Sequence, residues 1–200
     1  LIRSLTKNNI KVTALTRNIH QKGYILKTQA NPGYLDIVEG SIFDYDLVKK
    51  LFSNADLCVN LVGILFEKGK NTFNNIHVEF PKMISKLAST YKIQKFVHLS
   101  ALGIESAEDS VYAQSKLKGE KEILNNFKRA VIVRPSIVYS VDDNFTTQLM
   151  TLLGILPVFP IYYNGKTKFR PIHCSDLTNS ITKIITNDIK ENIIEFAGPE

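Results

Sequence analysis

A tyrosine and a lysine four residues apart are the side chains of this sequence best suited to chemistry. Tyr112 and Lys116 lie in a segment of helical character, so their spacing places them on one face of a helix. An ammonium group near a phenol favours the phenolate and lowers a tyrosine pKa that is normally about 10. Such a tyrosine can pass a proton to or from a substrate oxygen while hydride moves. For this pair alone, the alternative is a packed tyrosine beside a solvated lysine.

A serine stands where it could assist that tyrosine. Ser100 follows an expected strand, Lys95–Leu99. In open parallel α/β sheets, the carboxyl ends of the strands border the ligand crevice. A hydroxyl there could donate a hydrogen bond to a substrate oxygen, so Ser100 is a third candidate for the same site.

Short apolar runs alternate with helical periodicity along the chain, which predicts an α/β fold with a doubly wound parallel sheet, covered on both faces. The expected strands are Lys11–Leu15, Tyr34–Val38, Leu57–Val62, Lys95–Leu99, Ala130–Arg134 and Ile193–Ala197. The expected helices are Tyr45–Phe52 after Asp44, Phe80–Thr90, Val111–Asn126, Phe145–Leu153, and Leu177–Thr186 capped by Asp176.

The start of the chain does not match the start of such a fold. Leu1–Lys7 has helical character and leads directly into the strand Lys11–Leu15. In a doubly wound fold, that helix follows a first strand and a Gly-rich phosphate loop. We therefore expect a single, N-terminally truncated domain over residues 1–200 that lacks the first strand, with a substrate-side region starting near 140–200. The expected strand order is 3-2-(1)-4-5-6 with the central place empty.

Four motifs follow one another on this scaffold: NLVG (Asn60–Gly63), HLSALG (His98–Gly103), YAQSK (Tyr112–Lys116) and RPSIVY (Arg134–Tyr139). Together they resemble the extended and atypical short-chain dehydrogenase/reductase superfamily, the epimerase/dehydratase-like proteins. Within it, CVNLVGILFE, FVHLSALG and YAQSKLKGE are most similar to the NAD(P)H-binding accessory subunit of respiratory complex I (NADH-ubiquinone oxidoreductase) and its alphaproteobacterial relatives. The resemblance covers nearly the whole chain, and the ordered set is far more specific than YxxxK alone.

This resemblance implies a Rossmann-like, NAD(P)-binding domain with a catalytic group formed by Ser100, Tyr112 and Lys116. It also implies cofactor contacts at strand ends and on the following helix. A small residue such as Gly63 would let the backbone approach the cofactor, although a strand end can also need a turn glycine. The implied contacts are Asn60, Val62 and Gly63 after the third expected strand, Lys116 on the helix, and Pro135 and Ser136 near the nicotinamide.

Two further positions bear on the adenosine half of the cofactor. Arg17 follows a strand at the point where an acidic residue would accept from the ribose 2′-hydroxyl of NAD, whereas an arginine accommodates a 2′-phosphate. No acid lies between Lys11 and Gln21, which favours NADP(H) over NAD(H); the alternative is an ordinary surface arginine. Ser41 and Ile42 replace the aspartate that relatives often carry for adenine contact, and Ile42 could still pack on the adenine.

Three functions remain open from the sequence. The first is a largely non-catalytic accessory protein of the respiratory chain that holds NADPH as a structural ligand, with complex I as its partner. The second is an active oxidoreductase, epimerase or dehydratase that uses Ser100, Tyr112 and Lys116. The third is a degraded fragment that binds no cofactor because the phosphate loop is missing.

Composition narrows these classes. The net charge of +6 comes from 25 Lys and Arg against 19 Asp and Glu, and the lysines are scattered, which disfavours nucleic-acid binding. Two distant cysteines and four scattered histidines give no disulfide framework and no metal motif, and a catalytic histidine is not expected. No apolar run approaches the ~18 residues that span a bilayer. We expect a cytoplasmic or matrix-like protein, or one peripheral at the inner membrane.

Overall fold

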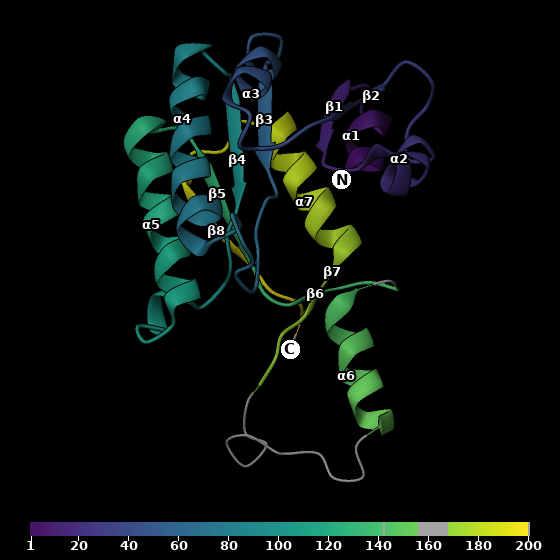
Figure 1. Ribbon diagram of the computed structural model, residues 1–200, viewed down its shortest axis with the longest axis vertical. Coiled ribbons are helices and arrows are strands. Elements are labelled where there is room, and N and C mark those ends of the chain that lie inside the picture. Colours follow the sequence, from purple (N-terminus) through teal and green to yellow (C-terminus); the bar gives the residue numbers. More distant parts are fainter. Residues whose placement is uncertain (142, 156–167, 200) are drawn as a thin grey trace.

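The computed structural model describes residues 1–141, 143–155 and 168–199 (Figure 1). The strands are β1 (Val12–Thr16), β2 (Leu35–Glu39), β3 (Leu57–Asn60), β4 (Lys95–Leu99), β5 (Val131–Pro135), β6 (Val138–Tyr139), β7 (Ile172–His173) and β8 (Ile193–Phe196). The α-helices are α1 (Ile2–Lys7), α2 (Ile19–Lys27), α3 (Tyr45–Phe52), α4 (Phe80–Thr90), α5 (Val111–Asn126), α6 (Asn144–Ile155) and α7 (Cys174–Thr186). A π-helix, η1 (Asn74–Glu79), and a 3-10 helix, η2 (Ile104–Ser106), complete the elements.

All strand pairs are parallel, as the alternation of strands and helices predicts. One sheet has the order β3-β4-β5-β8, a second consists of β1 and β2, and β6 pairs with β7. In Figure 1 the β1–β2 pair stands apart from β3. Within the described ranges, no strand pairs with the remaining edge of β1 or of β3. The strand order within each sheet agrees with the expected one. The central strand that a doubly wound fold places between β1 and β3 is not among the described strands.

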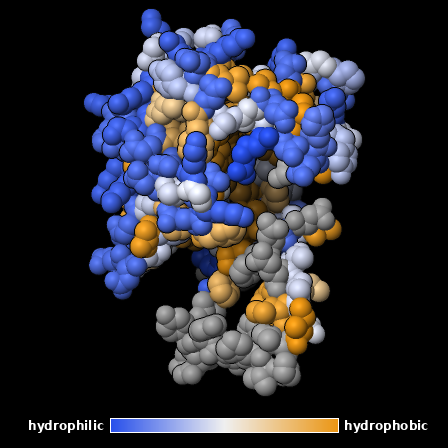
Figure 2. Space-filling view, viewed as in Figure 1, coloured by the Kyte–Doolittle hydropathy of each residue, from blue (hydrophilic) through white to orange (hydrophobic). Residues whose placement is uncertain are grey.

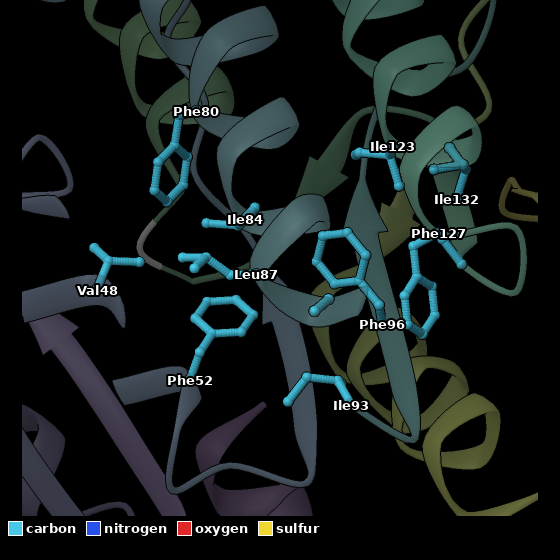
Figure 3. Close-up of a cluster of buried hydrophobic side chains, with 12 residues drawn as sticks. Val48, Phe52, Phe80, Ile84, Leu87, Ile93, Phe96, Ile123, Phe127 and Ile132 are labelled. Carbon is cyan, nitrogen blue, oxygen red and sulfur yellow. The ribbon is translucent and has the colours of Figure 1, made fainter. Parts of the chain in front are cut away.

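Two apolar clusters cover the two faces of the main sheet. The first lies under α3, α4 and α5 and contains Val48, Phe52, Phe80, Ile84, Leu87, Ala88, Ile93, Phe96, Ile123, Phe127, Ala130 and Ile132 (Figure 3). The second lies against α1 and α7 and contains Leu5, Val97, Val131, Val133, Ile172, Leu177, Ile181, Ile184 and Ile185. Because alternate residues of a strand point to opposite faces, His98 shares the face of Phe96, toward α4 and α5. The polar side chain of His98, near the carboxyl end of β4, is therefore directed toward α5.

Several elements differ from the expectation, and three of them have a clear local cause. The expected strand Leu57–Val62 ends at Asn60, because the Asn60 side chain accepts the N–H of Val62 (3.0 Å) and takes it out of the ladder. Helix α2 was not expected; Gly23 interrupts its sequence, and its N-terminus is capped by Asn18. Helix α7 begins at Cys174, capped by the His173 side chain rather than by Asp176.

Helix η1 is a π-helix that runs directly into α4. The N–H of Phe80 donates to the carbonyl of Asn75, five residues earlier, as in a π-helix. Pro81 has no N–H, so it donates nothing to the carbonyl of His77, four residues earlier. The carbonyl of His77 faces α5, where a β-carbon on Gly119 would overlap it. The close approach of η1 and α5 therefore requires a glycine at this position.

Helix α6 opens the expected substrate-side region and differs in surface character from α3, α4 and α5. Figure 2 shows hydrophobic residues gathered over it, including the exposed Met150, Leu152, Leu153 and Ile155. Its sequence contains no Asp, Glu, Lys or Arg. Taking the described ranges together, none of the helices combines the length and the apolarity needed to cross a membrane.

Candidate functional site

A cluster of polar side chains is buried where β3 and β4 end. Its members come from β3, η1, β4 and α5, and each exposes 7% of its surface or less. They are Asn60, His77, His98, Ser100, Ser115 and Lys116. The catalytic residues expected from the sequence thus contribute Ser100 and Lys116 to one buried group.

Lys116 lies in the second turn of α5, whose start is set by Ser110 accepting the N–H of Ala113. Its Nζ donates to the carbonyl of Leu99, 3.3 Å away, directly before Ser100. Burial lowers the pKa of Lys116 to about 8, and Glu120 partly opposes this effect. Lys116 can therefore change between ammonium and neutral amine close to physiological pH.

Gly63 has no side chain, and the end of the Lys116 side chain lies in the space that this leaves. A β-carbon on Gly63 would lie 3.2 Å from the Lys116 Nζ and 3.8 Å from the Nε2 of His77. The glycine expected to let the backbone approach a cofactor also makes room for this lysine.

Ser100 and His98 each present a buried polar atom with no hydrogen-bond partner in the described part of the chain. These atoms are the Oγ of Ser100 and the Nε2 of His98. Buried polar atoms without partners are rare in folded proteins, and each such atom calls for an explanation such as a ligand or an ordered water. The Ser100 hydroxyl is thus available for a group that enters the site.

The protonation of His98 follows from its partner. The Asn60 Oδ1 accepts the N–H of Val62, so its Nδ2 faces the Nδ1 of His98 at 2.9 Å and donates to it. The ring proton of His98 is then on Nε2. Burial, followed by the charges of Lys116 and His77, lowers the pKa of His98 to about 3. His98 is a neutral donor that points into the cluster.

His77 is also neutral, with the opposite tautomer. Its Nε2 accepts the N–H of Ile64 (3.1 Å), so its Nδ1 carries the proton and donates to the Oγ of Ser115 (2.9 Å). The Ser115 hydroxyl in turn donates to the carbonyl of Tyr112 (2.7 Å). Burial and the charge of Lys116 lower the pKa of His77 to about 4.

Tyr112 is engaged through its ring. It packs edge-on against His77 (5.4 Å between centroids) and against Phe73 (5.9 Å). Burial raises the pKa of Tyr112. The expectation that Lys116 would lower this pKa is therefore wrong, because burial among aromatic rings disfavours the phenolate.

Five more residues expected to contact the cofactor lie at the carboxyl ends of two strands that flank β4. Asn60, Val62 and Gly63 end or follow β3, while Pro135 ends β5 and Ser136 follows it. Val62 packs against the first apolar cluster, and Pro135 is buried. The sheet thus brings both groups to the edge that carries Ser100.

The residues expected near the adenosine lie together at the end of the β1–β2 pair. Arg17 is exposed after β1, and Ser41 is exposed after β2. Ile42 is half-buried and packs against the first apolar cluster. The carboxylate of Glu39, which ends β2, accepts the N–H of Ile19 (3.1 Å) at the start of α2. The segment between residues 11 and 21 lacks an acid, but the neighbouring strand supplies one there.

Three members of the cluster are not predicted by the sequence: His77, His98 and Ser115. The histidines are far apart along the chain, so their spacing did not indicate that they converge. One local signal was present, since His98 stands two residues before Ser100 and thus on the same side of β4. For His77 no such signal existed.

The architecture defines the class of fold: a Rossmann-like α/β fold built on parallel strands. The profile of the RmlD substrate binding domain matches residues 105–195. A UDP-glucuronic acid 4-epimerase from Bacillus cereus, solved with UDP-glucuronic acid and NAD, has the same fold with a TM-score of 0.75. It is 19% identical, over 100% of this chain and 74% of the epimerase.

The sequence itself is homologous to a respiratory-chain subunit. The mitochondrial NADH dehydrogenase (ubiquinone) 1 alpha subcomplex subunit 9 of Dictyostelium discoideum is 27% identical over 201 residues, covering 100% of this chain and 56% of that protein. Its counterpart in Mus musculus is 26% identical over 175 residues, covering 87% and 46%. The chain spans about half the length of these curated relatives. The resemblance to the extended and atypical superfamily, and to this accessory subunit, is confirmed.

Proposed function

We propose that this chain is the dinucleotide-binding domain of an accessory subunit of complex I, or of a close relative of that subunit, and that it holds NADP(H) mainly as a structural ligand. The observation that carries the proposal is the buried Ser100–Lys116 cluster in a chain homologous to that subunit. The raised pKa of Tyr112 disfavours its phenol as the base of an oxidation, whereas a neutral phenol can serve as the proton donor of a reduction.

The residues of the cluster fit the nicotinamide half of a dinucleotide. The Lys116 ammonium can donate to ribose hydroxyl oxygens, and Ser100 and His98 offer donors that lack partners among the described residues. The backbone at Gly63 can approach the cofactor, while Pro135 and Ser136 would border the nicotinamide. When bound, the nicotinamide would supply or accept hydride.

Two side chains would have opposite effects on the preference for NADP(H) over NAD(H). The Arg17 guanidinium suits a ribose 2′-phosphate, and Ser41 and Ile42 stand where the adenine would lie. The Glu39 carboxylate suits a 2′-hydroxyl instead, although it already accepts the N–H of Ile19. Arg17→Ala should therefore weaken NADPH more than NADH, and Glu39→Gln should favour NADPH. The opposite order would show that NAD(H) is the ligand.

A second candidate function is that of an active oxidoreductase, epimerase or dehydratase. The observation in its favour is the buried Ser100 hydroxyl without a described partner, which can donate to a substrate oxygen. Tyr112→Phe separates the two functions: it should leave dinucleotide affinity unchanged if the cofactor is structural. It should abolish hydride exchange between NADPH and a carbonyl substrate if the protein is an enzyme.

The relatives named above are mitochondrial proteins. We propose a matrix-like location for this chain, peripheral at the inner membrane where it joins the complex. Co-sedimentation with NADH dehydrogenase activity after mild detergent extraction tests this partner.

The binding proposal is tested by titrating the protein with NADPH and NADH, followed by calorimetry. We expect NADPH to bind. Lys116→Met should weaken the affinity for NADPH about tenfold or more, because at least one charge-assisted hydrogen bond is lost. Lys118→Met is the matched control, because Lys118 is exposed on the same helix. Absence of binding by either dinucleotide would instead support a fragment that binds no cofactor.

A further inference from the structure

His77 joins two segments that flank the proposed dinucleotide site. Its Nε2 accepts the N–H of Ile64, in the loop that follows β3 (3.1 Å). Its Nδ1 donates to Ser115 (2.9 Å), the residue directly before Lys116 on α5. One imidazole thus spans from the loop of Gly63 to the helix of Lys116.

Two aromatic rings also contact the imidazole. Phe73 stacks on it with centroids 5.4 Å apart, and the Tyr112 ring meets it edge-on at the same distance. The Ser115 hydroxyl continues the chain of hydrogen bonds to the carbonyl of Tyr112. Only 1% of the His77 surface is exposed, so the buried ring keeps a single orientation of its two nitrogens.

The backbone of His77 also packs closely against α5. The π-helical turn and Pro81 leave its carbonyl facing Gly119, where no β-carbon fits. Single π-helical turns occur frequently at functional sites. Both ends of His77 are therefore fixed against α5.

We propose that His77 is a positioning residue of the dinucleotide site: it holds the loop of residues 61–64 against α5 and so maintains the spacing between Gly63 and Lys116. This inference rests on the proposed function. Without the imidazole, the Ile64 N–H would lose its acceptor and the loop could move away from Lys116. The lysine would then lose the glycine-lined space in which it would meet a cofactor.

Three variants test this role. His77→Ala removes both hydrogen bonds, and His77→Gln can restore them, because its amide offers one acceptor and one donor. His20→Ala is the matched control, because His20 is exposed on α2. The readouts are hydrogen exchange at the Ile64 amide without any dinucleotide and the Kd for NADPH.

We expect His77→Ala to raise exchange at Ile64 about tenfold or more and to weaken NADPH about tenfold, as the loss of one or two buried hydrogen bonds implies. His77→Gln should recover most of both, and His20→Ala should change neither. Unchanged exchange at Ile64, or unchanged affinity for NADPH, in a folded His77→Ala protein would overturn the proposal. If His77→Ala does not fold, Ser115→Ala decides in its place: it should raise Ile64 exchange about threefold, and unchanged exchange there overturns the proposal.

The two proposals fail separately. If the unaltered protein binds no dinucleotide, the proposed function fails, while exchange at Ile64 still measures the link made by His77. If the unaltered protein binds NADPH and His77→Ala binds it equally well, the positioning role fails and the proposed function stands.

Discussion

Arg134 and Glu120 form a two-point ion pair between β5 and α5. The Nε of Arg134 lies 3.1 Å from the Oε1 of Glu120, and its Nη2 lies 2.7 Å from Oε2. Their side chains expose 5% and 4% of their surface. Glu120 is one helical turn beyond Lys116 and raises its pKa, against the larger effect of burial. The pair therefore connects the sheet to the helix of the candidate site and supplies negative charge near Lys116.

Replacing Arg134 by Met should destabilise the protein by ~3–5 kcal/mol, because the Glu120 carboxylate would remain buried without its partner. Glu105 and Glu195, the other partners of Arg134, are exposed and can turn to water. Urea unfolding at neutral pH measures the change. The double variant Arg134→Met/Glu120→Leu should recover most of the loss, and a double variant as unstable as the single one would contradict this account.

Gly119→Ala should also destabilise the protein, although alanine normally favours a helix. The gain in helix propensity is about 0.8–1.0 kcal/mol. The new β-carbon would overlap the carbonyl of His77, and overpacking of this kind costs ~1–3 kcal/mol. Because the overlap is with a backbone atom, the cost lies toward the upper end of that range and the expected net loss is ~1–2 kcal/mol, measured by thermal or urea unfolding. The control is Gly154→Ala in α6, where no atom lies within 4 Å; an equal effect at both glycines would count against the close approach.

The two buried histidines should make the fold sensitive to acid. Folded pKa values of about 4 for His77 and about 3 for His98 lie below the ordinary value of 6.5, so the unfolded chain binds more protons between these limits. Stability therefore rises with pH in this window and is lost as pH falls from about 6.5 toward 4. The free energy of unfolding should depend less steeply on pH across this range in His77→Gln and His98→Gln. A slope that persists unchanged in both variants would assign the effect to other groups.

Lys116 should produce a second rise in the free energy of unfolding, at alkaline pH. Its pKa of about 8 in the folded protein is below the ordinary 10.5, so the unfolded chain again binds more protons between the two values. Stability should increase by up to ~3 kcal/mol as pH rises through this window. The raised pKa of Tyr112 acts in the opposite sense above about pH 10, so the comparison is best confined to ~8–9.5. The Lys116→Met protein should lack the rise, and a rise that persists in it would assign the effect to another group.

The sequence by itself determined the parallel α/β class and most of its elements. The expected helices Tyr45–Phe52, Phe80–Thr90 and Val111–Asn126 agree with α3, α4 and α5, since apolar spacing and caps are local properties. The motif order also predicted the superfamily and the convergence of Ser100 and Lys116. Such features depend on neighbours in the chain or on the rule that parallel strands bring their carboxyl ends together.

Only the tertiary structure decided the electrostatic state of the site. His77 and Ser115 meet although 38 residues separate them, and no periodic pattern links the two. The effect of burial on Lys116 and Tyr112 depends on every element packed around them, so the rule that a lysine lowers a tyrosine pKa did not hold here. Glu39 reaches the start of α2 for the same reason: β2 lies beside β1 in space. Desolvation and long-range contacts arise from the assembled fold, and spacing along the chain does not encode them.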